Sequence, residues 1–411
     1  MMNTAGPIKD FAVGIYDGPH ATPEPSDDGP IFLGIKNVTE DGRLDFSEIR
    51  HVSEKEFPKR TRRVKPQRDD IVFSYEATLH RYARIPDGFE GCLGRRMALI
   101  RPDVKKVDPR FLHYYLLSPL WRAKMDAITI NGATVNRIPL TNFPDTVVSF
   151  PGLNEQAAIA DILSAYDDLI ENNRRRIALL EEAGRMLYRE WFVHFRFPGH
   201  EHVKIIDGLP EGWERKQIAE LAEIFRGKSY SSQELVDEGG QPFVNLKCMQ
   251  RFGGFRVSGL KGFRGEHKDH HALASGDIII AVTDMTREAM IVAQAARIPK
   301  TVGEGAIYSM DLVKAVPKDG IDANWFYGLL RFSRFSAEVR QEATGATVLH
   351  LKPKHIEGWA AIVPSALLRG LFAEQFGSFL DQIDNLELQS EKLAQARDLL
   401  LPRLMNGEIS V

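Results

Sequence analysis

The chain has 411 residues, and its hydrophobic content of 43% and charged content of 27% are ordinary for a soluble globular protein. A prior of about 150 residues per domain predicts two to three domains. The net charge of −3 does not indicate a nucleic-acid binder, although an acidic face can hide a basic one in the sum.

Cysteine usage and apolar runs exclude several classes of protein. Cys92 and Cys248 are too few for a disulfide framework and fit a reducing compartment. The chain opens without a cationic-then-apolar signal, and no stretch approaches the roughly 20 apolar residues of a membrane span. We therefore expect a cytoplasmic protein with no membrane contact.

Four segments follow one another along the chain. Residues 1–150 are mixed, with predicted strands at Ile31–Val38 and Asp70–Tyr75 and a predicted helix at Pro109–Ala127. Residues 151–200 open with Pro151-Gly152 and are strongly helical. Residues 201–363 repeat the mixed pattern, with predicted strands at Phe243–Met249 and Asp277–Val282 and a helix at Ala323–Glu342. Residues 364–411 are helical again and end at Asn406-Gly407.

The second half of the chain repeats the first half at a nearly constant offset. Asn131-Gly132-Ala133-Thr134-Val135 recurs as Thr344-Gly345-Ala346-Thr347-Val348, and 345 − 132 = 213. The same offset relates Tyr114 to Tyr327, Pro151 to Pro364, Asp168 to Asp381 and Asn172 to Asn385. This period is far too long for a solenoid, so it indicates duplication of a domain plus a helix. A protein that reads two half-sites on a symmetric polymer needs such a duplication.

Both helical segments carry an apolar stripe with alternating steps of four and three residues. In the first helical segment the stripe contains Ile159, Leu163, Tyr166, Ile170, Asn173, Ile177, Leu180, Gly184, Leu187 and Trp191. Adding 213 gives the second stripe, which contains Phe372, Phe376, Phe379, Ile383, Leu386, Ser390, Leu393, Arg397, Leu400 and Leu404. This spacing predicts a coiled-coil seam. The alternative is two amphipathic helices, each packed separately on its own domain.

The spacing also predicts how the two helices pair. The first stripe is palindromic about position 175, because (159 + 191)/2 = 175, so an antiparallel partner pairs residue i with residue 350 − i + 213. Asn173 then faces Ser390, and the two polar exceptions can form a hydrogen bond. Gly184 faces Phe379, and Tyr166 faces Arg397 in a cation–π contact. A parallel alignment in equal register would instead leave Asn173 and Ser390 each facing an apolar residue.

The sequence contains no catalytic signature. Gly227-Lys228-Ser229 resembles the end of a P-loop, but Ala222 stands where that motif needs its upstream glycine. No Asn-Pro-Pro-aromatic loop is present, which argues against a self-contained amino-methyltransferase. His267, His270 and His271 cluster without a neighbouring cysteine. We therefore interpret them as surface histidines and not as ligands of a zinc site. We therefore assign no catalytic residue and no metal ligand.

Basic residues concentrate in both mixed segments, where Lys and Arg could neutralise phosphates. A charge run alone is usually a solvated face, but here both copies carry one. The Gly-Ala-Thr-Val repeats are either tight turns that packing demands or places where backbone approaches a ligand closely. The candidate DNA-contacting residues are Lys36, Lys59, Arg60, Arg62, Arg63, Lys65, Arg81, Arg84 and Thr134 in the first segment, and Arg226, Lys228, Lys247, Arg251, Arg256 and Thr347 in the second.

Several motifs resemble those of type I restriction–modification specificity subunits, the HsdS family. Pro151-Gly152-Leu153-Asn154-Glu155-Gln156 and the run from Leu187 to Gly199 are similar to the central conserved region of that family. Leu209-Pro210-Glu211-Gly212-Trp213 resembles the opening of the second target-recognition domain, and Asp17 to Pro23 resembles an opening of the first. The run from Leu399 to Ile409 is similar to the C-terminal ending. The first copy lacks the Gly-Trp opening, so the boundary of the first domain is not fixed.

The resemblance implies a non-catalytic reader of double-stranded DNA. The implied fold is α/β, with two duplicated target-recognition domains, residues 1–150 and 201–363, separated by two long antiparallel coiled-coil helices, residues 151–200 and 364–411. Each domain would read half of a bipartite target. Two modification subunits would methylate adenine with S-adenosylmethionine, and restriction subunits would use ATP and Mg²⁺, so this chain itself would bind no cofactor. No base-contacting residue carries over, because the recognition domains vary widely in the family.

Two other classes compete with this interpretation. The chain could be a stand-alone DNA-acting enzyme, either a nuclease or a methyltransferase, which would be active on DNA without other subunits. It could also be a coiled-coil scaffold with no role on DNA, which would bind no duplex with or without modification subunits.

Overall fold

The computed structural model describes residues 3–24, 26–132, 135–237, 239–286 and 288–411. The chain forms two compact units, one containing Met1–Ile170 and Lys392–Val411 and the other containing Glu171–Glu391. Both units are mixed α/β, and each includes part of the 40-residue helices α4 (Leu153–Phe192) and α9 (Ala366–Met405). The division of the sequence into four segments stays a prediction.

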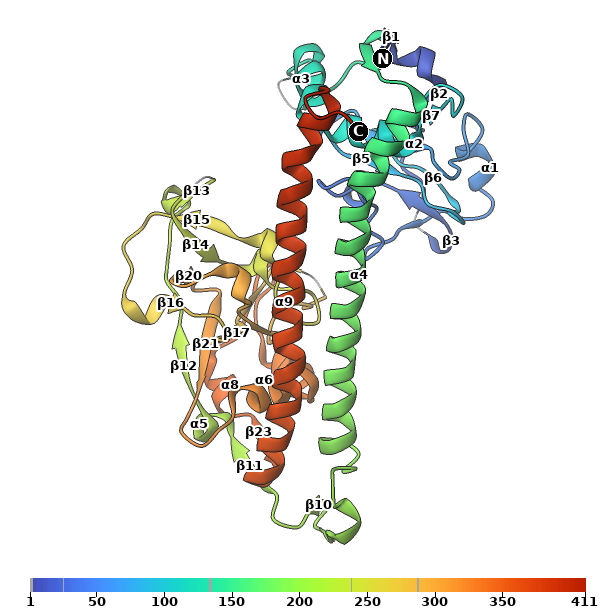
Figure 1. The fold of residues 1–411 in the computed structure, drawn as a ribbon. Helices are drawn as coiled ribbons and strands as arrows, with labels where there is room; N and C mark the ends of the chain where they lie inside the picture. The colour runs from blue at the N-terminus through green and yellow to red at the C-terminus, as the bar shows by residue number, and fades with distance from the viewer. Residues whose placement is uncertain (1–2, 25, 133–134, 238, 287) are drawn as a thin grey trace. The chain divides into compact units, whose positions relative to one another are not determined.

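Unit 1 is built around a four-stranded antiparallel sheet in the order β2-β7-β4-β5 (Figure 1). Two further pairs are β3 with β6, which is parallel, and β1 with β8, which is antiparallel. The elements are β1 (Thr4–Pro7), β2 (Ala12–Asp17), β3 (Ser26–Leu33), α1 (Phe57–Arg60), β4 (Ile71–Ser74), β5 (Tyr82–Arg84), β6 (Gly91–Leu93), β7 (Met97–Pro102), α2 (Pro109–Leu117), α3 (Pro119–Ile128) and β8 (Val147–Phe150).

Strand β4 shows why this sheet is buried on both faces. Successive side chains of a strand point to opposite faces, and Ile71 and Phe73 join the core formed with α2, α3 and the long helices. Val72 between them joins a second core on the other face. An apolar run of this kind therefore stabilises two layers at once.

Unit 2 contains a four-stranded antiparallel sheet in the order β12-β21-β17-β19 and a five-stranded sheet in the order β13-β15-β14-β20-β16 (Figure 1). Its elements are β9 (Ile205–Ile206), β10 (Leu209–Pro210), β11 (Glu214–Gln217), α5 (Ile218–Leu221), β12 (Ala222–Arg226), β13 (Leu235–Val236), β14 (Gln241–Val244), β15 (Lys261–Phe263), β16 (Ala272–Leu273), β17 (Ile278–Ala281), β18 (Thr283–Asp284), β19 (Ala295–Arg297), β20 (Ala306–Tyr308), β21 (Leu312–Pro317), α6 (Ala323–Phe332), α7 (Phe335–Val339), β22 (Leu349–His350), α8 (Pro353–Glu357) and β23 (Ala360–Val363).

The central sheet of unit 2 separates two cores in the same way. On β17, Ile278 and Ile280 join the core formed with α6 and the long helices, and Ile279 joins the core beneath the five-stranded sheet. The strand pairings also match those of unit 1, because β12, β21, β17 and β19 pair in the pattern of β2, β7, β4 and β5. A parallel pair, β14 with β20, corresponds to β3 with β6.

Two predicted helices are each interrupted in the structure. The helix predicted over Pro109–Ala127 ends at Leu117 and restarts at Pro119, and the Ser118 hydroxyl accepts from the Trp121 N–H at 3.3 Å. Proline disfavours helical backbone in the residue before it, so Ser118 is extended. The helix predicted over Ala323–Glu342 divides at Ser333, which is also extended and accepts from the Phe335 N–H at 3.0 Å.

Two predicted strands are shorter than expected. The strand predicted over Ile31–Val38 ends at Leu33, and the one predicted over Phe243–Met249 ends at Val244. Each is followed, after one residue, by a 3-10 turn, Ile35–Asn37 in unit 1 and Leu246–Cys248 in unit 2. In each turn an asparagine side-chain oxygen accepts from a main-chain N–H: Asn37 accepts from Gly34 at 3.0 Å, and Asn245 accepts from Lys247 at 2.8 Å. These local hydrogen bonds compete with continuation of the strand.

The predicted contact between Asn173 and Ser390 is confirmed within unit 2. The Asn173 side-chain amide donates to the Ser390 hydroxyl at 3.3 Å, and that hydroxyl donates to the Leu386 carbonyl at 2.7 Å. Further along α4, Gly184 lies against the ring of Phe376. The two contacts advance in opposite directions along the two helices, as antiparallel pairing requires.

Two details of the predicted register are wrong. The ring nearest to Gly184 is that of Phe376, whereas the predicted ring, Phe379, lies three residues further along α9. The small residue does face a large ring, but one turn away from the predicted one.

In unit 1 the Arg397 guanidinium pairs with the Asp167 carboxylate at 2.5 Å, and its partner is therefore the neighbour of Tyr166. Tyr114 also donates to Asp167 at 2.5 Å. Among the residues described, the cation–π contacts do not include Tyr166 with Arg397.

The same substitution at two helical glycines is expected to have opposite effects. A Cβ at Gly184 would lie 2.4 Å from Cε2 of Phe376, whose ring is buried, whereas a Cβ at Gly370 in α9 meets nothing within 4 Å. Gly184→Ala should therefore lower the free energy of unfolding by about 1–3 kcal/mol through overpacking. Gly370→Ala should raise it by up to about 1 kcal/mol, because alanine favours the helix. Urea unfolding measures both, and equal shifts of the same sign would show that Gly184 has no packing role.

Candidate DNA interface

Helix α1 presents a group of cations on a buried apolar base. Phe57 at its start is buried with Phe32, Val52 and Cys92. Lysine and arginine side chains follow from Lys59 onward, and most of them are exposed. One anchored residue thus holds a short, charged turn at the surface of unit 1.

These cations line a cavity of about 250 Å³, here called the α1 pocket, whose walls are Pro19, His20, Ala21, Glu56, Lys59, Arg60, Arg62 and Arg63. Arg60 is held by a hydrogen bond to the Ala21 carbonyl at 2.5 Å, and Arg63 is paired with Asp17. For Lys59 and Arg62 the structure shows no hydrogen bond or ion pair to any residue it describes, so both charges remain free to meet an anion. The pocket therefore brings together four residues predicted to contact DNA.

The other predicted residues of unit 1 lie outside the pocket and are mostly engaged by acids. Arg81 pairs with Glu40 and Arg84 with Asp69, each at 2.6 Å. Lys65 lies 5.1 Å from the centre of the Phe57 ring and 3.4 Å from Glu90. Lys36 is exposed on the 3-10 turn after β3. Thr134 lies outside the residues that the structure describes.

The predicted cations of unit 2 lie at or near the surface on several separate segments. Arg226 is exposed at the end of β12, and the Lys228 ammonium lies 3.8 Å from Glu234. Three more are exposed on the segments between β14 and β15, namely Lys247, Arg251 and Arg256. Their arrangement fits a spread of backbone contacts better than a single anion site.

The second Gly-Ala-Thr-Val repeat forms a closed loop. Thr344 and His350 exchange main-chain hydrogen bonds of 3.0 and 2.8 Å, and Thr347 between them is exposed. Gly345 has φ of 143°, and a Cβ there would lie 2.0 Å from the Val348 carbonyl oxygen. The turn itself therefore requires the glycine. Thr347 is exposed, and its contact with DNA stays a prediction.

A neighbouring loop of unit 2 is held by one buried carboxylate. Asp284 is fully buried and accepts from the N–H groups of Thr286, Ile291 and Val292 at 2.6–2.9 Å and from the Thr286 hydroxyl at 2.7 Å. Burial acts to raise the pKa of this carboxyl, but the hydrogen bonds outweigh it and hold the pKa below its usual value. Met285 at the start of the loop is 74% exposed. Thr283 and Asp284 pair with His350 and Leu349, so this loop adjoins the closed one.

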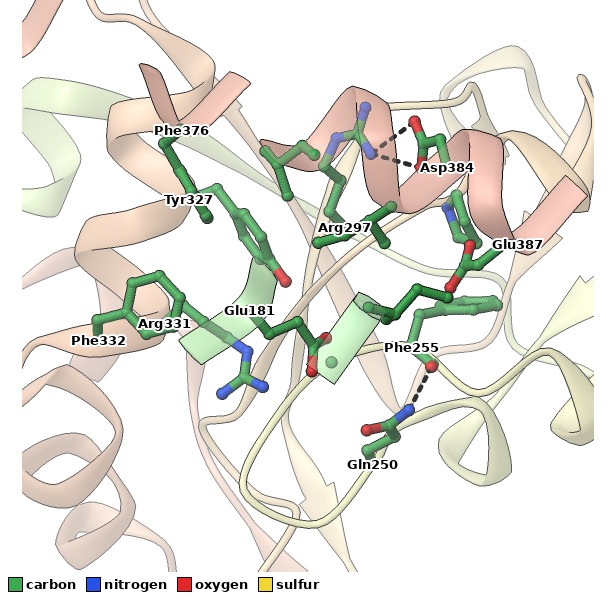
Figure 2. A pocket seen from close by; sticks show the side chains of 15 residues that line it. Glu181, Gln250, Phe255, Arg297, Tyr327, Arg331, Phe332, Phe376, Asp384 and Glu387 are labelled. Carbon is green, nitrogen blue, oxygen red and sulfur yellow. Dashed lines mark hydrogen bonds and ion pairs between the residues drawn. The ribbon is translucent and has the colours of Figure 1, made fainter. Parts of the chain in front are cut away.

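A second cavity, of about 140 Å³, lies in unit 2 and combines acids with arginines (Figure 2). Asp384 is 1% exposed and accepts two hydrogen bonds of 3.0 Å from Arg297. Burial, together with the charges of Asp384 and Glu181, raises the pKa of Glu387 to about 7. Sequence reasoning missed this cluster, and the only available signal was that Asp384 follows the seam residue Ile383.

The described part of the chain carries neither a metal-binding cluster nor a membrane-spanning helix. No group of three or more His, Cys, Asp or Glu side chains there could hold a metal ion, and the rings of His270 and His271 meet edge to face, with their centroids 4.2 Å apart. No described helix combines the length and apolar character needed to cross a membrane.

The comparisons with known proteins agree on one family. A family model described as the type I restriction modification DNA specificity domain matches residues 30–182. The specificity subunit of the type I restriction enzyme MjaIX of Methanocaldococcus jannaschii is 24% identical over 313 residues, which is 72% of this chain and 68% of the relative. That of HindI of Haemophilus influenzae is 21% identical over 379 residues, covering 76% and 80%.

A solved structure agrees at the level of the fold. The S subunit of the type I restriction–modification system of M. genitalium has a TM-score of 0.52 at 17% identity, over 98% of this chain and 96% of that one. The class is thus a mixed α/β protein with long helices. The chain is similar to type I restriction enzyme specificity subunits over most of its length, and its residues 30–182 match the DNA specificity domain of that family.

Proposed function

We propose that the chain is the DNA sequence-specificity subunit of a type I restriction–modification complex and that it performs no catalysis itself. Similarity to type I specificity subunits over most of the chain, with a match to their DNA specificity domain, is the observation that carries the proposal. A stand-alone nuclease or methyltransferase is not favoured, because the relatives are specificity subunits.

Each mixed segment acts as one target-recognition domain and reads one half of a bipartite target sequence in double-stranded DNA. The matched strand pairings of the two units support an origin by duplication. The two long helices support it too, because 366 − 153 = 213 and 405 − 192 = 213, the offset of the sequence repeat. Base readout is local to a groove-facing surface, so two copies supply two separate readings.

The helices α4 and α9 form an antiparallel coiled coil that sets the gap between the half-sites. Within unit 2 the Asn173–Ser390 hydrogen bond supports this pairing, and within unit 1 the Asp167–Arg397 ion pair does. Two modification subunits dock beside the helices and use S-adenosylmethionine. Restriction subunits complete the complex and use ATP and Mg²⁺, so the cofactors belong to the partners.

Exchange of one recognition domain tests the proposal. Replacing residues 1–150 by the equivalent segment of a related specificity subunit should change one half of the DNA target and leave the other half as it was. Selection of bound duplexes from a random library reads out both halves, with the unaltered chain as the control. A folded exchange variant that altered both halves would contradict modular reading, and a wild-type chain that selected no sequence would contradict the function itself.

A further inference from the structure

A short hairpin between β14 and β15 carries an exposed phenylalanine at its tip. Met249 and Phe255 pair as an antiparallel bridge, and the Gln250 N–H donates to the Gly254 carbonyl at 3.0 Å. The Gln250 side chain also donates to the Phe255 carbonyl at 2.7 Å (Figure 2). Phe252 stands at the turn between the two arms and is 64% exposed. A large apolar ring thus faces solvent at the surface of unit 2.

The backbone at Phe252 adopts a conformation that bulky residues seldom tolerate. Its φ is 63°, in the left-handed region, and the next two residues, Gly253 and Gly254, have φ of 91° and 98°. Glycine takes such angles without steric cost, and asparagine takes them more readily than phenylalanine does. Strained residues cluster at binding and active sites, and a ring that is mostly in solvent gains too little from packing to explain the strain.

The strained tip is held to the body of unit 2 by hydrogen bonds. The Arg331 guanidinium, from α6, donates to the Phe252 carbonyl and, at 2.8 Å, to the Gly253 carbonyl. In addition, the Phe252 N–H donates to the Met290 carbonyl at 3.3 Å. A Cβ on Gly253 would lie 2.7 Å from Nη1 of Arg331, so glycine there lets the guanidinium approach. The backbone that carries the ring therefore cannot fold back without breaking these hydrogen bonds.

Cations flank the ring along the hairpin. Lys247, Arg251 and Arg256 are all exposed, and the Arg256 N–H donates to the Cys248 carbonyl at 2.7 Å, which continues the hairpin. Cations attract phosphates, and an aromatic ring stacks on the flat faces of bases. Duplex DNA offers both, and DNA-bending proteins insert phenylalanine or leucine between adjacent base pairs. An acidic protein surface would pair with the cations but leaves the strain at Phe252 unexplained.

We propose that Phe252 is a wedge that inserts between two adjacent base pairs of the half-site read by residues 201–363, while the flanking cations contact phosphates. This inference rests on the proposed function and adds to it a residue that deforms the DNA. Separating stacked base pairs costs free energy, so a wedge must keep its conformation when it is pressed into the stack. The hydrogen bonds from Arg331 meet this requirement, whereas a ring that only touched the surface of a groove would not need them.

The test compares the full-length wild type with Phe252→Asn and with a Leu367→Ala control, on a duplex that the wild type selects from a random library. Leu367 is 73% exposed at the start of α9, outside the hairpin. Energy transfer between labelled duplex ends measures the bend, and 2-aminopurine in place of each adenine in turn fluoresces where stacking is lost. The wild type and the control should kink the duplex by roughly 20–90° at one step. Phe252→Asn should lose the kink and bind about tenfold or more weakly.

Two further measurements separate a wedge from a structural role. Asparagine suits the left-handed backbone, so Phe252→Asn should be at least as stable as the wild type in urea unfolding. Phe252→Leu keeps an apolar side chain of a kind that DNA-bending proteins insert, and it should retain most of the kink. Should Phe252→Asn not fold, Phe252→Gly takes its place, with the same loss of the kink expected.

Four outcomes would overturn the inference. A Phe252→Asn chain that kinks its target as the wild type does would show that the ring is not inserted. So would a wild type that binds its target selectively without bending or unstacking it. Equal losses of affinity in Phe252→Asn and Leu367→Ala would reduce the effect to lost apolar surface. A wild type that selected no sequence would contradict the proposed function, and the wedge with it.

Discussion

A chain carrying Lys59→Glu and Arg62→Glu is expected to bind every duplex roughly a hundredfold more weakly at about 0.1 M salt, because each lost phosphate contact removes about one decade of affinity. The dependence of log affinity on log salt should fall by about one for each contact. These two residues are chosen because the structure gives them no partner among the residues it describes, and the folding stability should therefore stay unchanged. Filter binding at several salt concentrations measures both effects.

The choice of residues keeps folding separate from binding. Arg60 and Arg63 are left intact because Arg60 donates to the Ala21 carbonyl and Arg63 pairs with Asp17. The control reverses Lys105 and Arg122, two exposed cations of unit 1 outside the α1 pocket. An equal loss of affinity in both double variants would mean that only net charge matters, and no loss in either would make the α1 cations solvated surface.

Replacing Arg297 by methionine is expected to lower the free energy of unfolding by about 3 kcal/mol or more, because Asp384 would remain buried without its partner. The Asp384 carboxylate is 1% exposed and accepts two hydrogen bonds from the Arg297 guanidinium (Figure 2). The Lys300 ammonium, 3.9 Å away, compensates only in part. Removing both charges with Arg297→Met and Asp384→Leu should recover most of the loss, since an apolar pair of similar volume replaces a buried ion pair at little cost.

Urea unfolding of the single and double variants measures this coupling, with Lys300→Met as the control. The Lys300 side chain is 43% exposed, so its loss should cost less than about 1 kcal/mol. If Arg297→Met were no more destabilising than Lys300→Met, the ion pair between Arg297 and Asp384 would make no special contribution to folding stability. A double variant as unstable as the single one would point instead to lost packing by the arginine stem.

The long helices were the most predictable part of the fold. A stripe over many heptads specifies which face is buried, and two polar exceptions on two stripes gave the Asn173–Ser390 contact directly. The sequence was less informative about which side chain fills the space beside Gly184. Aromatic rings one turn apart can both reach such a space, and spacing alone does not choose Phe376 over Phe379.

The candidate site was predictable in composition but not in pairing. The sequence identifies the cations, yet the acids that neutralise them are distant along the chain. Asp17 is 46 residues from Arg63, and Glu40 is 41 residues from Arg81. The cluster of Glu181, Asp384 and Glu387 depends on segments even further apart, so only the folded chain reveals it. The break at Ser118 could have been predicted from Pro119, because proline at the first helical position marks a new helix.

The loop held by Asp284 has a consequence for how such a protein changes over generations. The carboxylate accepts hydrogen bonds mainly from main-chain N–H groups, which are the same whatever side chains the loop carries. Met285 projects into solvent, so point substitutions there alter the chemistry of the surface and leave the shape of the loop intact. As long as Asp284 is retained, single substitutions can therefore change the side chains of the loop without changing the conformation of its backbone.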